Sequence, residues 1–138
     1  MKRTLLLIPL FFIAFWFFES TTVYETTPEM KEAARQATVD REVPIPPNDF
    51  YQDGCSMFPN FLLWHDFRPG CLEHDIAYWA GGTNKERKDA DLALREQIRQ
   101  TGPLGPVFAP LMYYGVRAFG DSFITRTIGA HWGYGWDE

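Results

Sequence analysis

The chain has 138 residues, of which 46% are hydrophobic and 17% aromatic, so it can form one compact domain but not two ordinary ones. Charged residues make up 22% and the formal net charge is −5, which disfavours nucleic acid as a partner and excludes the apolar-poor composition of a disordered protein. The two cysteines can form one disulfide bridge if the chain folds in an oxidising compartment.

The N-terminal residues have the layout of an export signal. Lys2 and Arg3 precede an uncharged apolar run from Leu5 to Phe18, and Glu19 ends it. This run is shorter than the ~20 residues that usually span a bilayer. We therefore expect residues 1–20 to be a signal peptide or an uncleaved signal anchor. Either one places the rest of the chain outside the cytosol, in a secreted, periplasmic or membrane-anchored protein.

Residues 21–48 are polar and rich in proline, and they are predicted to be a spacer with a short helix from Pro28 to Ala37. The remaining residues, 49–138, form the predicted domain. Its first part, from Asp49 to Gly70, is rich in aromatic residues and turn formers and has no sustained period, which indicates an ordered loop region. The pair His65 and Asp66 is expected on the surface of this region.

Local signals in the middle of the domain predict two helices. The first runs from Cys71 to Ala80 and is closed by two glycines. The second begins with a capping box formed by Thr83 and Glu86 and runs to about Gln100. Because the turn between them is short, the two helices should lie antiparallel.

A third, apolar helix is expected from about Leu111 to Phe119, with Pro110 at its start. No repeat and no alternating-strand pattern is present in the sequence. The predicted fold class is therefore all-α, with two antiparallel central helices, a loop region before them and an additional apolar C-terminal helix.

Four polar or reactive side chains share one face of the first central helix, at spacings i, i+3, i+4 and i+7: Cys71, His74, Asp75 and Tyr78. A buried polar group without a partner costs about 1 to 3 kcal/mol, so a neighbouring element must supply partners. On the second helix, Asp91 has helical spacing with Leu94 and Ile98 and should point inward. A carboxylate there can accept hydrogen bonds from His74 and Tyr78, which would hold the imidazole in one tautomer and raise its basicity.

Asp75 points about 100° away from His74, so the two side chains can line adjacent parts of one site. A carboxylate supported by loop carbonyls is the usual ligand set for calcium, and the loop from Asp53 to Phe58 offers such carbonyls. A calcium ion beside a histidine-activated water is suited to ester hydrolysis. Three alternatives stay open: a zinc site with Cys55, Cys71 and His74, a purely structural His74, and an Asp91 that only accepts from Tyr78.

The segment Cys71-Leu72-Glu73-His74-Asp75-Ile76-Ala77-Tyr78 resembles the C-x-x-H-D-x-x-Y pattern of the secreted phospholipase A2 superfamily. The resemblance extends from about Gly54 to Ile98. It implies that His74 is the general base and that Tyr78 supports a second catalytic aspartate. For that aspartate Asp91 is preferred to Asp89, because its helix face is the apolar one.

The same resemblance implies a calcium site and a disulfide. Asp75 corresponds to the side-chain ligand of Ca²⁺, and three backbone carbonyls fall at the positions of the loop ligands: those of Gly54, Ser56 and Phe58. Cys55 and Cys71 have the spacing of a bridged pair in the family. The chain departs from the family in its bulkier loop and in having one bridge. It also has no clear second supporting tyrosine, for which Tyr113 and Tyr114 are the candidates.

The function implied is calcium-dependent hydrolysis of the sn-2 acyl ester of glycerophospholipids by a histidine-activated water. Its substrate would be phospholipid at a membrane or micelle interface. The alternative is a non-catalytic calcium-binding or interaction module on the same scaffold. A further rival is a membrane-anchored structural protein in which the helix pair is only packed.

Overall fold

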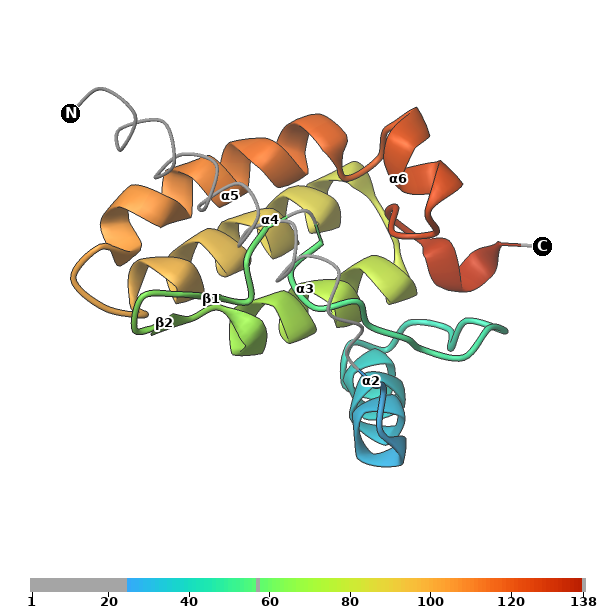
Figure 1. Cartoon of the computed structure of the whole chain (residues 1–138). Helices are drawn as coiled ribbons and strands as arrows, with labels where there is room; N and C mark the ends of the chain where they lie inside the picture. Colours follow the sequence, from blue (N-terminus) through green and yellow to red (C-terminus); the bar gives the residue numbers. More distant parts are fainter. Residues whose placement is uncertain (1–24, 57, 138) are drawn as a thin grey trace, which may run out of the picture.

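The computed structural model describes residues 25–56 and 58–137, which form a mostly helical fold (Figure 1). In chain order the elements are α2 (Pro28–Asp40), β1 (Phe61–Leu62), β2 (His65–Asp66), α3 (Arg68–Ala80), α4 (Asn84–Arg99), α5 (Gly105–Phe119), α6 (Phe123–Thr127) and the 3-10 helix η1 (Tyr134–Trp136). The all-α class is confirmed, because the only strands described are one antiparallel pair of two-residue strands. The expected signal at residues 1–20 lies outside the described residues. Within the described ranges, no helix is both long and apolar enough to cross a membrane.

The helices α3 and α4 begin and end where local signals place them. Gly81 follows α3 with φ +67, and a Cβ there would lie 2.8 Å from the Cα of Gly133, so the turn requires glycine. The capping box is confirmed: Thr83 Oγ1 accepts from the Glu86 amide at 3.2 Å, and Glu86 accepts from the Thr83 amide at 2.7 Å. α3 begins at Arg68, three residues before the predicted start, because proline is tolerated in a first helical turn.

Contacts between α3 and α4 run in opposite order along the two helices. Gly70, early in α3, lies against Gln97 and Ile98, late in α4. Tyr78, near the end of α3, contacts Arg87 near the start of α4. Figure 1 shows the chain reversing its direction from α3 to α4 and again from α4 to α5. The faces of α3 and α4 that carry the candidate site residues therefore meet along the length of the pair.

Helix α5 begins at Gly105, six residues earlier than predicted, and Pro110 lies inside it. Pro106 in the first turn needs no amide donor, and Pro110 removes only one further backbone bond. A Cβ on Gly105 would lie 2.4 Å from the carbonyl oxygen of Arg99, so glycine permits the close approach of α5 to the end of α4. The start predicted at about Leu111 was wrong because a proline was taken as a boundary.

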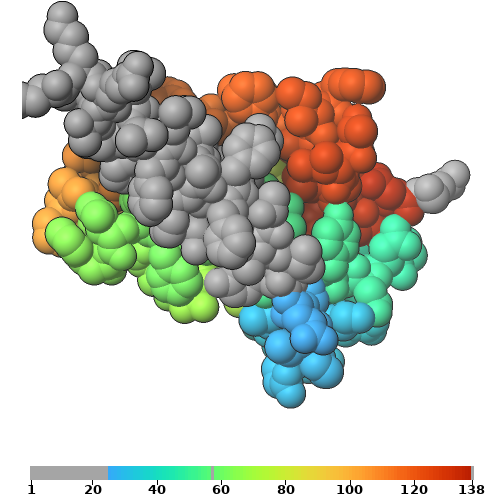
Figure 2. Space-filling model, in the orientation of Figure 1, coloured from blue at the N-terminus to red at the C-terminus, as the bar shows by residue number. Residues whose placement is uncertain are grey.

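The segment expected as a spacer carries α2, which extends three residues beyond the predicted Ala37 and packs on the domain. Ala34 is fully buried in a cluster with Phe50 and Trp79. Lys31 and Arg35 on the same helix form ion pairs with Asp49. Figure 2 shows α2 projecting from the lower edge of the molecule, beside the segment that follows it.

The loop region before α3 contains the short β1–β2 hairpin, and its histidine is not at the surface. His65 is fully buried, and its ring packs with those of Trp64, Phe67 and Phe108. Its Nδ1 lies 3.0 Å from the hydroxyl of Thr101. The expectation of a surface position was wrong because three aromatic residues distant or adjacent in sequence enclose the imidazole.

The C-terminal tail covers the end of α3. The indole of Trp132 donates to the carbonyl of Gly82 at 2.9 Å, and the indole of Trp136 donates to that of Ala80 at 2.9 Å. The bond to Ala80 satisfies a carbonyl at the C-terminus of α3, which otherwise lacks an intrahelical donor, and the bond to Gly82 holds the turn that follows. The tail thus has a packing role that no sequence pattern indicated.

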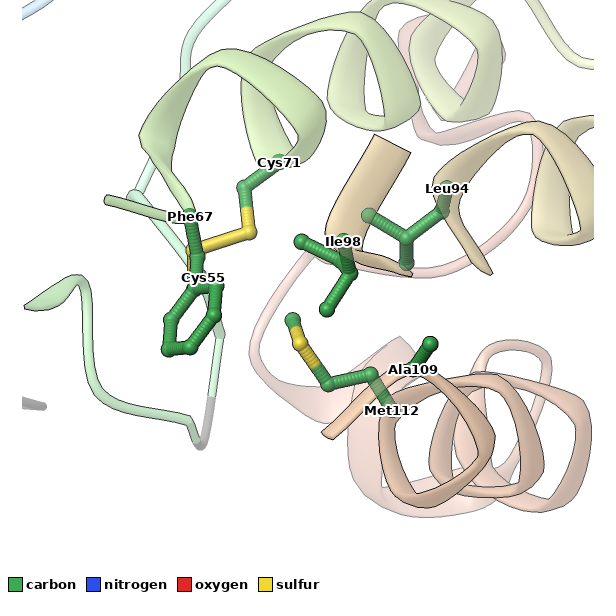
Figure 3. Packing of buried hydrophobic residues seen from close by; sticks show 7 residues of the cluster. All are labelled: Cys55, Phe67, Cys71, Leu94, Ile98, Ala109 and Met112. Carbon is green, nitrogen blue, oxygen red and sulfur yellow. A yellow bond between two sulfur atoms is a disulfide. The ribbon is translucent and has the colours of Figure 1, made fainter. Parts of the chain in front are cut away.

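The core between α3, α4 and α5 contains the disulfide bridge (Figure 3). Its buried members are Cys55, Phe67, Cys71, Leu94, Ile98, Ala109 and Met112. In Figure 3, Ile98 of α4 lies next to the bridge, and Ala109 and Met112 of α5 lie below Ile98 and Leu94. This cluster fixes the first turn of α3, one helical turn before His74.

Candidate functional site

A histidine from α3 and an aspartate from α4 form the centre of the candidate site. Nε2 of His74 lies 2.8 Å from Oδ1 of Asp91, and Asp91 is fully buried. An ionised carboxylate can only accept, so the proton of this bond belongs to Nε2, and in the neutral imidazole Nδ1 would carry the lone pair. His74 also lines the cavity described below. The pair expected from helical spacing is therefore brought together, whereas Asp89 is exposed and pairs with Lys85.

Further donors hold the Asp91 carboxylate. Tyr78 donates to Oδ1 at 2.8 Å, and Nη1 of Arg117 donates to Oδ2 at 2.7 Å. Burial acts to raise the pKa of Asp91, but the hydrogen bonds from His74, Arg117 and Tyr78 outweigh it and hold the pKa below its ordinary value of 3.8. Asp91 thus remains ionised although its side chain is fully buried.

Tyr78 supports both members of the pair. Its ring lies against the His74 imidazole, with the ring centroids 4.1 Å apart. Burial raises the pKa of Tyr78, Arg87 lowers it and Asp91 raises it again, with a net increase that keeps the phenol protonated as a donor. A Cβ on Gly120 would lie 2.2 Å from the Tyr78 oxygen, so the glycine after α5 makes room for this hydroxyl.

The bridge between Cys55 and Cys71 is present and ties the loop to α3, with Cα atoms 5.2 Å apart. Both thiols are consumed, so the zinc alternative was wrong. Gly54 has φ +78, and a Cβ there would lie 2.5 Å from Oδ1 of Asn60. That Asn60 oxygen accepts from the Cys55 amide at 2.9 Å, which fixes the loop immediately before the bridge.

Asp75 carries an unsatisfied oxygen in the site. Its Oδ2 is buried and has no hydrogen-bond partner within the described part of the chain. Burial, and then the nearby carboxylate of Asp53, raise the pKa of Asp75 well above its ordinary value. A buried carboxylate oxygen without a hydrogen-bond partner is free to act as a ligand for a cation. Asp75 is therefore a candidate cation ligand.

The expected loop ligands lie near Asp75. Gly54, Ser56 and Phe58 line the same cavity as Asp75 and His74. Among residues 25–56 and 58–137, no group of three or more His, Cys, Asp or Glu side chains could hold a metal ion. The ligand set implied by the resemblance has one carboxylate and several backbone carbonyls, so it depends on the loop backbone rather than on such a group.

A predominantly apolar cavity of about 300 Å³ opens beside His74. Helix α5 and the segment after it supply much of its wall, with Leu111, Met112, Val116, Phe119 and Ile128. Two of these wall residues, Leu111 and Ile128, are half exposed or more. The site therefore joins an ionised polar network to a hollow that suits an apolar chain.

Two arginines belong to the site although no sequence pattern indicated them. Arg117 was not singled out, although it is the only charged residue of α5 and a lone charge in an apolar helix needs a partner. Arg87 was not singled out either, and it donates to the carbonyls of Val116 and Arg117. Tyr114, a candidate for the second supporting tyrosine, is 69% exposed, and Tyr113 packs on it and beneath Arg95. The second oxygen of Asp91 is contacted by Arg117 rather than by a tyrosine.

Comparisons of the chain with protein-family models, with curated proteins and with solved structures found no match. The assignment of this site therefore depends on its own residues and geometry.

Proposed function

We propose that the chain is a calcium-dependent phospholipase A2-like hydrolase that cleaves the sn-2 acyl ester of glycerophospholipids. The observation that carries the proposal is the buried pair of His74 and Asp91, whose geometry leaves Nδ1 of His74 for a water molecule beside an apolar cavity. The adjacent, unpartnered oxygen of Asp75 supports a cation in the same site.

His74 acts as the general base in this proposal. Asp91 accepts the Nε2 proton and keeps the imidazole in the tautomer whose Nδ1 can take a proton from water. The water oxygen attacks the ester carbonyl carbon while its proton passes to Nδ1. The ester C–O bond then breaks, and the same proton passes to the departing glycerol oxygen, which restores neutral His74.

Calcium would be held by Asp75 and by the backbone carbonyls of Gly54, Ser56 and Phe58. When bound, it would supply positive charge for the developing oxyanion. The cavity wall from α5 favours an acyl chain over a polar substrate. The partner is phospholipid in a membrane or micelle, and the apolar N-terminal run expected to be an export signal would place the domain outside the cytosol.

Fatty-acid release from sn-2-labelled phospholipid micelles by the oxidised protein tests the proposal, with calcium and with chelator. We expect calcium-dependent release that falls by about 100- to 10,000-fold in His74→Gln, the range for losing a general base. Asp91→Asn should also be strongly impaired. Asp89→Asn, an exposed aspartate on the same helix, is the matched control and should retain activity.

The alternative function predicts a different result. If the folded protein releases no fatty acid, the motif belongs to a non-catalytic module. A calcium-dependent rise in its unfolding temperature would then indicate a binding module. The lack of such a rise would indicate that the helix pair is purely structural.

A further inference from the structure

Helix α5 sends one charged side chain into the polar network. Arg117 is the only charged residue from Gly105 to Phe119, and its Nη1 lies 2.7 Å from Oδ2 of Asp91. His74 and Tyr78 both contact the other oxygen, Oδ1. Arg117 therefore contacts the carboxylate oxygen of Asp91 that His74 and Tyr78 do not contact.

The network needs a positive charge at this point. Asp91 is fully buried, and an ionised carboxylate out of water is strongly unfavourable unless it is paired. The phenol of Tyr78 is a neutral donor, and His74 has to be neutral to act as the proposed base. Arg117 supplies a permanent positive charge that contacts the Asp91 carboxylate.

The backbone of Arg117 is also held in place. Nη2 of Arg87 donates to the carbonyls of Val116 and Arg117, at 3.1 and 3.2 Å. Arg87 and Asp91 lie one turn apart on α4, so the end of α5 is bound to the helix that carries the carboxylate. The backbone of Arg117 and the carboxylate that its side chain contacts are thus both held by α4.

We propose that Arg117 is a positioning residue that holds the Asp91 carboxylate, so that Asp91 keeps Nε2 of His74 occupied and Nδ1 directed to the cavity. This inference rests on the hydrolase function proposed above. Arg117 does not line the cavity, whereas Met112 and Val116 of the same helix do. Helix α5 therefore forms the substrate wall and also steadies the base through Asp91.

The contact suggests a matched pair of substitutions. Only one nitrogen of Arg117 bonds the carboxylate, so a lysine can replace the charge without the bidentate geometry that usually separates the two residues. Arg117→Met keeps the apolar stem and removes both charge and donor. Arg126→Gln, an exposed arginine on α6, is the control for loss of one positive charge near the cavity.

Two measurements on the full oxidised chain test the proposal. In steady-state hydrolysis, Arg117→Met should lower kcat by about 10- to 100-fold with little change in KM, the usual cost of losing a supporting partner. Arg117→Lys should recover most of kcat, and Arg126→Gln should match the original protein. In proton NMR with ¹⁵N-histidine, the downfield Nε2–H signal of His74, assigned with His74→Gln, should persist in Arg117→Lys and be lost in Arg117→Met.

The NMR measurement separates failure of this inference from failure of the proposed function. If the original protein does not hydrolyse phospholipid, loss of the His74 signal in Arg117→Met with recovery in Arg117→Lys still supports positioning. An unchanged signal and unchanged kcat in Arg117→Met would overturn the inference. If Arg117→Met does not fold, a folded Arg117→Lys without the signal would overturn it as well, and one with the signal would support it.

Discussion

The dipeptide His-Asp occurs twice in the sequence, once in the β1–β2 hairpin and once in α3, and the two copies have different surroundings. His65 is enclosed by aromatic rings and contacts a threonine hydroxyl, while Asp66 forms an ion pair with Arg68 at 2.9 Å. His74 instead contacts a buried carboxylate and lines a cavity, and Oδ2 of Asp75 has no partner in the described part of the chain.

The two copies show that the chemical role of a side chain depends on its partners in the fold rather than on its neighbour in the sequence. In the hairpin, Asp66 pairs with an arginine, and His65 bonds Thr101 through Nδ1 while its Nε2 is buried among aromatic rings without a hydrogen-bond partner in the described part of the chain. In α3, His74 bonds Asp91 through Nε2 and lines a cavity, and Asp75 keeps a buried oxygen without a hydrogen-bond partner in the described part of the chain. Asp75 is therefore a candidate for binding a cation, and Asp66 is not.

The disulfide bridge distinguishes α3 from the hairpin strands. Its removal should have the largest effect on stability. Because the bridge spans 16 positions, replacing both Cys55 and Cys71 by alanine should lower the free energy of unfolding by about 3 kcal/mol. Urea denaturation of the double variant, compared with the chemically reduced original protein, measures this loss. An unchanged midpoint would mean that the loop is fixed by its other contacts alone, such as the Asn60 bond.

Calcium should distinguish the two aspartates. At a calcium concentration about a hundredfold above the dissociation constant, binding should stabilise the fold by about 2.7 kcal/mol, and Asp75→Asn should abolish this gain. Asp66→Asn should retain it, because Asp66 already pairs with Arg68. Thermal unfolding with calcium and with chelator measures the effect. Equal stabilisation of Asp75→Asn and the original protein would place any calcium site elsewhere.

Acid should weaken the α3–α4 network more than the hairpin. The pKa of Asp91 lies below 3.8 in the folded protein, so the unfolded chain takes up this proton first as the pH falls. The stabilisation that ionised Asp91 contributes is present above pH 3.8, the pKa of the unfolded chain. It is lost as the pH falls through the lower pKa of Asp91 in the folded protein. Unfolding free energy measured into acid should therefore decline less steeply in Asp91→Asn than in the original protein.

The same experiment should show a weaker dependence for Asp66. The hydrogen bond from Arg68 lowers the pKa of Asp66, but this carboxylate is 39% exposed and solvent screens its interactions. If Asp66→Asn flattens the acid dependence as much as Asp91→Asn does, the contrast between the two sites is wrong.

The smallest effect is expected from the surface ion pair itself. Asp66→Ala should lower the free energy of unfolding by less than about 1 kcal/mol, because both partners are partly exposed. His65 should stay buried, since its contacts are to rings and to Thr101 rather than to Asp66. Thermal unfolding and the near-ultraviolet circular dichroism of the aromatic cluster check the two statements. A loss of the aromatic signal would show that Asp66 helps to hold the hairpin.

Much of the α3–α4 pair could be predicted, because its signals are local. Two glycines end α3, the capping box of Thr83 and Glu86 begins α4, and both lie at the predicted residues. Helical spacing placed Cys71, His74 and Tyr78 on one buried face. The inward position of Asp91 followed from its apolar neighbours on the same helix face.

The start of α5 and the position of His65 could not be predicted in this way. Proline usually breaks a helix, and Pro110 was therefore expected at the start of α5. The helix instead begins at Gly105, which packs against the end of α4, and Pro110 lies inside it. His65 has no periodic signal, and its burial depends on Phe108, more than forty positions away. In both places, contacts distant in sequence outweighed a local preference.

Local sequence patterns were enough to predict the two central helices, the face of α3 that carries the candidate base and the spacing of the two cysteines. Three contacts depend on tertiary packing instead. Arg117 reaches Asp91, Arg87 holds the end of α5, and tail tryptophans cover the end of α3. The reason is physical. Helix caps and helix faces depend on residues a few positions apart, whereas the partner of a buried charge depends on which helix packs against it.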